Sequence, residues 1–111
     1  MRLNWAGTAS STINNLVAGE KFEFLSRNSV IKVYACADTA TGAVEADFSL
    51  GNVIVGDNLV IPLHTATLGP ERDKHLLARA IGRAGDRIQL RMRETGAVNT
   101  PTRVLIEIDE I

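Results

Sequence analysis

The side chains with the most chemical potential in this sequence are arginines that gather in one stretch. Seven of the 12 Lys and Arg residues lie close together, at Arg72, Lys74, Arg79, Arg83, Arg87, Arg91 and Arg93. A guanidinium keeps its charge and pairs with a carboxylate or a phosphate through two parallel hydrogen bonds. The stretch could therefore form ion pairs within an exposed face, contact an acidic surface of another subunit, or contact the phosphates of a nucleic acid.

The surrounding residues rank these three interpretations. Positions 72–93 contain no aromatic residue on which a base could stack, and the formal net charge of the chain is −1, so nucleic-acid contact is the least favoured. Acidic residues lie among the arginines and elsewhere, so internal ion pairs and a charge-matched subunit contact both stay open. Trp5 is a further candidate, because a lone Trp in a polar segment packs on its own domain or docks on a neighbour. The candidate interface residues are Trp5, Arg72, Arg79, Arg83, Arg87, Arg91 and Arg93.

The other reactive side chains are too few and too scattered for an active site. Cys36 is the only cysteine, so the chain has no internal disulfide and no thiolate metal cage. His64 and His75 are eleven positions apart and have no carboxylate or cysteine at ligand spacing. The chain also lacks the GxSxG, HExxH and P-loop motifs. We therefore predict no catalytic, cofactor-binding or metal site, and we expect that the chain is not an enzyme.

Length and composition favour one β-rich domain. The 111 residues are 45% hydrophobic and 23% charged, which is ordinary for a single globular domain. No run approaches the roughly 20 apolar residues of a membrane span, so no membrane contact is expected. Val, Ile and Thr are abundant and turn residues recur every few positions, as in proteins built from short strands.

Alternating apolar and polar residues predict most of the elements. The strongest strand signal is Val30–Ala37, which a turn at positions 38–42 joins to its hairpin partner. Near the C-terminus, alternation at positions 87–93 and 103–109 predicts two strands that face each other across one core. The remaining predicted strands are Thr12–Val17, Glu20–Leu25, Ala43–Leu50, Val53–Val55 and Asn58–Leu63.

One segment has a helical period instead. Pro70 suits a first helical turn, and Gly85 suits the left-handed residue that ends a helix. Between them runs one apolar stripe of 3.6-residue period, formed by Leu76, Leu77, Ala80, Ile81 and Ala84. We therefore predict one short helix at about residues 70–84.

Together these elements predict a mainly β protein. We expect an antiparallel β-sandwich of jelly-roll or Greek-key type with one short helix, and the alternative is an open sheet with the helix on one face. Residues 1–17 are expected to form an N-terminal arm and a first short strand, and residues 18–111 the β-sandwich domain. The arm, Met1–Ser11, is expected to serve contacts between copies rather than the core.

Three features give the chain a resemblance to a known class of proteins. They are the polar arm, the segment AGEKFEFLSRNSVIKVYA that starts at Ala18, and AGDRIQLRMRET followed by a final strand. In these features the chain resembles the small single-sandwich, jelly-roll-like capsid and cement proteins of bacterial viruses. The resemblance covers most of the chain from Ala18 onward and rests on pattern rather than on a diagnostic motif.

The resemblance implies a viral structural protein, either a capsid subunit or a subunit that decorates a capsid. Its partners would be copies of itself or other virion proteins, and its place would be the virion, assembled in the host cytoplasm. Such proteins have no catalytic residues to carry over. The alternative is a small ligand-binding or carbohydrate-binding β-sandwich module.

Overall fold

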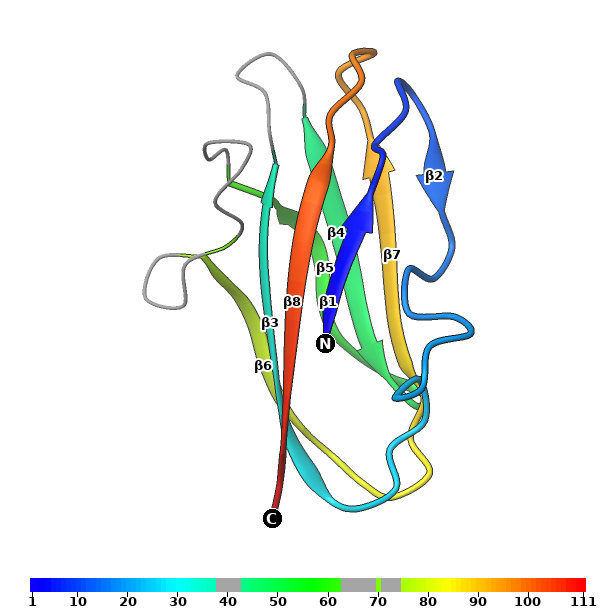
Figure 1. The fold of residues 1–111 in the computed structure, drawn as a ribbon, viewed down its shortest axis with the longest axis vertical. Helices are drawn as coiled ribbons and strands as arrows, with labels where there is room; N and C mark the ends of the chain where they lie inside the picture. Colours follow the sequence, from blue (N-terminus) through cyan, green and yellow to red (C-terminus); the bar gives the residue numbers. More distant parts are fainter. Residues whose placement is uncertain (38–42, 63–69, 71–74) are drawn as a thin grey trace.

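The protein is a sandwich of two antiparallel four-stranded sheets. A computed structural model describes residues 1–37, 43–62, 70 and 75–111. The strands are β1 (Arg2–Trp5), β2 (Thr12–Ile13), β3 (Ser29–Ala37), β4 (Val44–Leu50), β5 (Val53–Val60), β6 (Leu76–Gly82), β7 (Ile88–Glu94) and β8 (Thr102–Glu110). Sheet A has the order β1-β8-β3-β6 and sheet B the order β2-β7-β4-β5 (Figure 1).

This strand order is that of a jelly roll. Neighbouring strands in each sheet are distant in sequence, except for the hairpin of β4 and β5, and successive strands along the chain otherwise cross between the sheets. The prediction of an antiparallel β-sandwich is therefore confirmed. An open sheet with a helix on one face is excluded, because sheet B covers the face of sheet A.

The core lies between the sheets and is built by the alternation seen in the sequence. Ile88, Leu90 and Met92 of β7 are buried, as are Val104 and Ile106 of β8. Because β7 belongs to sheet B and β8 to sheet A, these two strands face each other across the core, as predicted. Phe48 of β4 is the largest fully buried side chain.

The N-terminal residues lie within the sandwich. Residues 2–5 of the predicted arm form β1 instead, which pairs with β8 from Arg2↔Leu105 to Trp5↔Thr102. Leu3 belongs to the core, and the carbonyl of Gly7 accepts a hydrogen bond of 2.8 Å from Thr100 N–H. The predicted first strand at Thr12–Val17 shortens to β2, which pairs with β7.

The predicted helix at about residues 70–84 is wrong. Residues 71–74 lie outside the described residues, but Leu76–Gly82 is strand β6, which pairs with β3. An apolar stripe of only nine residues is too short to stabilise a helix alone. As a strand, the same segment forms backbone hydrogen bonds with the edge of β3 that does not pair with β8. Gly85 does adopt the left-handed conformation expected of it, with φ 89°, but in the turn between β6 and β7.

Three other predictions need correction. Glu20–Leu25 is a series of turns rather than a strand, with one isolated bridge between Phe24 and Arg87. The two short strands predicted at Val53–Val55 and Asn58–Leu63 are one strand, β5, which continues through Asn58 at a positive φ of 53°. The predicted hairpin of Val30–Ala37 with Ala43–Leu50 is wrong, because β3 belongs to sheet A and β4 to sheet B, and β4 pairs with β5 and β7 instead. The turn predicted between them, at 38–42, lies outside the described residues.

Candidate interaction surfaces

Large apolar side chains are exposed on β5 and β6, the last strands of their sheets on one side of the sandwich. Those of β5 include Ile54 and Val60 on the outer face of sheet B, and Ile81 of β6 lies on the outer face of sheet A. Ile54 and Ile81 are 73% and 70% exposed. We call this surface the β5–β6 edge, and it consists of Val53, Ile54, Val60, Leu76 and Ile81 with Arg79 and Arg83 beside them. A large exposed apolar surface commonly marks a contact site.

Strand β6 has small side chains at two core positions and a large apolar side chain on its outer face. Cross-strand partners share a face of a sheet, so Ala80 and Ala78 lie on the core side with their partners Ile31 and Val33. Ile81, the largest apolar side chain in this part of β6, lies on the outer face with Val30. Ala78 and Ala80 therefore fill little of the core, and the larger side chains of β3 fill it instead. Burial of Ile81 would require another molecule.

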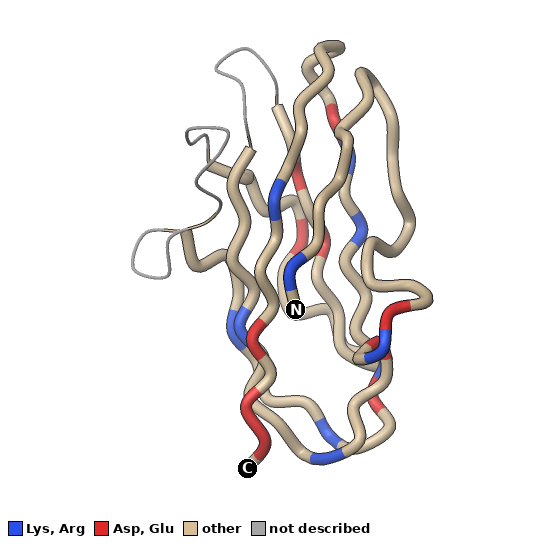
Figure 2. Tube along the Cα trace, viewed as in Figure 1, with Lys and Arg blue, Asp and Glu red and all other residues tan. Residues whose placement is uncertain are grey.

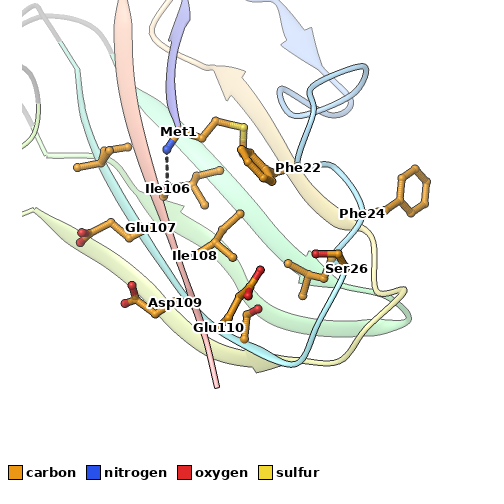
Figure 3. Close-up of a pocket in the computed structure, with 12 residues that line it drawn as sticks. Met1, Phe22, Phe24, Ser26, Ile106, Glu107, Ile108, Asp109 and Glu110 are labelled. Atoms are coloured by element: carbon orange, nitrogen blue, oxygen red, sulfur yellow. Dashed lines mark hydrogen bonds between the residues drawn. The ribbon is translucent and has the colours of Figure 1, made fainter.

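A groove of about 470 Å³ lies beside the C-terminal half of β8, on the opposite side of β3 from β6. We call it the β8 groove, and its main lining residues are Met1, Phe22, Phe24, Glu107, Ile108, Asp109 and Glu110. Figure 3 shows Phe22 close to Met1, and Ile108 pointing to the side of β8 where Phe22 and Phe24 lie. Phe22 and Phe24 are 47% and 58% exposed, so the groove combines an aromatic wall with an acidic strand.

The strand that lines this groove has an open edge. Met1 and Ile106 exchange two backbone hydrogen bonds of 2.8 Å, and β1 pairs only with the preceding residues of β8. Backbone N–H and C=O groups point to alternate sides along a strand. Those of Ile108 and Glu110 therefore point to the same side as those of Ile106. No described strand pairs with them there, and Figure 1 shows β8 continuing past the N-terminus toward the C-terminus.

The predicted arginines do not form one surface. Arg93 lies on the outer face of sheet B, where it forms ion pairs with Asp47 at 2.9 Å and Glu45 at 3.0 Å and also contacts Asn58. Hydrogen bonding to Asp47 raises the pKa of Arg93. Desolvation of the Asp47 carboxylate acts to raise its pKa, but hydrogen bonds from the Asn58 N–H and the Arg93 guanidinium lower it. Arg93 therefore serves the fold.

Arg87 is also paired internally, with its Nε 2.6 Å from an oxygen of Glu23. The Gly19 N–H and this arginine lower the pKa of Glu23. Arg79, Arg83 and Arg91 are exposed, and the structure gives them no ion pair within the described residues.

The last two candidates have different outcomes. Trp5 lies half-buried in β1 and packs against the core. Arg72 lies outside the described residues. Nothing in the structure tests the interface role of these residues, which stays a prediction.

A buried carboxylate holds the end of the sandwich that lies away from the C-terminus. Glu94 is 2% exposed, and its oxygens accept hydrogen bonds from the backbone N–H groups of Ala43, Gly96, Ser10 and Val98 at 2.9–3.4 Å. Desolvation would raise the pKa of Glu94, but these N–H groups lower it to about 2. Glu94 thereby joins β7, the start of β4 and the N-terminal segment through one charge.

The described residues contain no group of three or more His, Cys, Asp and Glu side chains that could hold a metal ion. Cys36 and His75 are buried, on β3 and just before β6, and His64 lies outside the described part of the chain. No helix in the described ranges is long and apolar enough to cross a bilayer. That the chain is not an enzyme stays a prediction.

Comparison with known proteins adds no relative: no protein family, no curated protein and no solved structure matches this chain. The function must therefore be argued from the fold and from the two surfaces.

Proposed function

We propose that this chain is a structural subunit of a bacterial virus, a capsid or capsid-decorating protein that acts by contact with copies of itself or with other virion proteins. Its place would be the virion, assembled in the host cytoplasm. The fold supports this by analogy alone, because jelly rolls occur in viral capsids and also in lectins.

The observation that carries the proposal is the β5–β6 edge. Val53, Ile54 and Val60 of β5 and Leu76 and Ile81 of β6 are at least half exposed, and Ala78 and Ala80 hold the core positions of β6 opposite Val33 and Ile31. Leaving so much apolar surface in water is unfavourable, at about 25 cal/mol per Å², so a partner that covers it gains a strong contact.

Mass photometry and sedimentation of the purified chain over a range of concentration test the proposal. We expect discrete oligomers that form as concentration rises and persist in part at high salt, because salt screens exposed ion pairs but not apolar contacts. An unchanged monomer at every concentration and salt, with no shell protein that binds it, would contradict the proposal.

The β8 groove favours a second candidate, a small ligand-binding or carbohydrate-binding module. Two exposed aromatic rings beside acidic and hydroxyl groups could take the apolar face of a sugar or a small cationic molecule. Calorimetric titration with oligosaccharides and aromatic amines tests it, with Phe22→Ala as the control that should abolish binding. Failure of every such titration alongside concentration-dependent oligomers would reject this alternative.

A further inference from the structure

We propose that the β8 groove of one copy receives the β5–β6 edge of a second copy of this chain. The contact would be head-to-tail and would continue sheet A from one subunit into the next. This inference rests on the proposed structural function and names the partner and the two surfaces involved.

Both surfaces offer a strand edge without a partner strand among the described residues. β6 ends the order of sheet A, with β3 on one side only, and the C-terminal half of β8 extends beyond its pairing with β1. Such edges pair readily with a strand of another chain, which supplies backbone hydrogen bonds. The two edges face away from each other, since β3 lies between β6 and β8, so one copy can use both.

The side chains beside the two edges have opposite charges on the same face of sheet A. Lys32 of β3 is the cross-strand partner of both Glu107 and Arg79, so these three side chains share the outer face. Asp109 and Ile81 share that face through Val30. Figure 2 shows the acidic residues along β8 toward the C-terminus and basic residues on the β3–β6 side. A neighbouring β6 beside β8 would therefore place arginine against carboxylates.

Both surfaces also have exposed apolar residues at the level of sheet B. β5 of sheet B contacts β6 of sheet A, and Phe24 reaches the level of sheet B through its bridge to Arg87. When sheet A continues into a second copy, the two phenylalanines meet the aliphatic residues of β5. Of the nine large apolar side chains that are exposed within the described residues, seven belong to these two surfaces: Phe22, Phe24, Val53, Ile54, Val60, Leu76 and Ile81.

Contact between two like surfaces is disfavoured by charge. Two β8 strands paired edge to edge would bring Glu107, Asp109 and Glu110 against the same acids of the partner, which is repulsive. A head-to-tail contact avoids this repulsion. Because each copy then keeps one free surface of each kind, the contact propagates until it closes into a ring, or it forms an open filament.

Charge reversal on each surface tests the pairing. Arg79→Glu alone and Asp109→Arg alone should each lower the association constant, measured by sedimentation, by about tenfold or more, because each places like charges together. An equimolar mixture of the two variants should assemble again. The reversed edge of the first variant then meets the reversed groove of the second, and the two unchanged surfaces meet as they do in the parent chain. Arg91→Glu, on the outer face of sheet B, is the matched control and should assemble like the parent chain.

The outcomes separate this inference from the proposed function. If the parent chain assembles and neither variant is weakened, or if the mixture of weakened variants does not recover, the pairing is refuted and the structural function stands. A parent chain that stays monomeric counts against both. Circular dichroism of each variant confirms that a loss of assembly is not a loss of fold.

Discussion

The two sides of the sandwich are built in opposite ways. On the β1–β2 side, apolar residues turn inward: Leu3 is in the core and Trp5 is half-buried against it. Hydrogen bonds hold this side to the rest of the sandwich. The Ser10 N–H donates a hydrogen bond to Glu94, and the Gly7 carbonyl accepts one from the Thr100 N–H. On the β5–β6 side, Val55, Leu59 and Leu77 pack against the core, but other large apolar residues, such as Ile54 and Ile81, are exposed.

This difference indicates how the two sides are used. The β1–β2 side uses its apolar and polar groups for the stability of the single chain. Under the proposed function, the exposed apolar residues of the β5–β6 side, including Ile54 and Ile81, serve contact with another molecule. Substitutions on the first side should therefore lower stability, and substitutions of exposed residues on the second should lower assembly.

The largest effect is expected from shortening the β1–β2 side. A chain that lacks residues 1–11 should lose the cooperative fold, because β8 loses its β1 partner and Glu94 loses a backbone donor. The milder Leu3→Ala should cost about 2–5 kcal/mol by leaving a cavity in the core. Thermal unfolding followed by circular dichroism measures both. A truncated chain with the parent's unfolding midpoint would show that the N-terminal segment is an arm after all.

Acid should weaken the same side through Glu94. Its pKa in the folded protein is about 2, below its ordinary value of 4.5. Its contribution to stability is therefore complete above about pH 4.5 and is lost as the pH falls toward 2. Urea unfolding across this range should show Glu94→Gln less stable at neutral pH and less dependent on pH than the parent chain. The exposed Glu20→Gln is the control, and equal pH dependence in the Glu94 variant would contradict this role.

On the β5–β6 side, one buried position should respond like a core residue. Gly82 ends β6, and a methyl group there would overlap the buried side chain of Leu25. Gly82→Ala should therefore destabilise the chain by about 1–3 kcal/mol, although an alanine would stabilise a helix. Chemical denaturation decides between the two, and a gain in stability would restore the helical interpretation of this segment.

The smallest effects should separate the arginines of sheet B by their partners. Arg93→Ala leaves Glu45 and Asp47 without their guanidinium and should cost about 1–2 kcal/mol. Arg91→Ala, two residues earlier on the same strand, should change stability by less than about 0.5 kcal/mol. Equal losses for the two variants in denaturant titrations would mean that the ion pairs of Arg93 add nothing.

The sandwich could be predicted because its strands carry a period of two wherever one face is buried. Val30–Ala37 and the segments of β4, β7 and β8 are of this kind. β6 could not be predicted, because Ala78 and Ala80 hold two of its core positions and Leu76 and Ile81 are exposed, so the apolar pattern suits a helix better than a strand. β1 was obscured by its length of four residues and its polar neighbours.

The candidate surfaces were only partly predictable. The arginine count directed attention to Arg87 and Arg93, yet the sequence does not show that Glu23 and Glu45 lie beside them in space. The alternation of Phe22 and Phe24 was visible, but not that a loop would expose both rings. The outward apolar residues of β5 and β6 become recognisable only once the sheet order makes both strands edges.

Hydrogen–deuterium exchange tests the contrast between the two sides most directly. Exchange of backbone amides is compared between dilute chain and concentrated, assembled chain. We expect slower exchange on assembly in β6, in β5 and at Ile108–Glu110, and unchanged exchange in β1 and β2. Protection that appears on β1 and β2 instead, with β5 and β6 unchanged, would contradict the assignment of the β5–β6 side to contact.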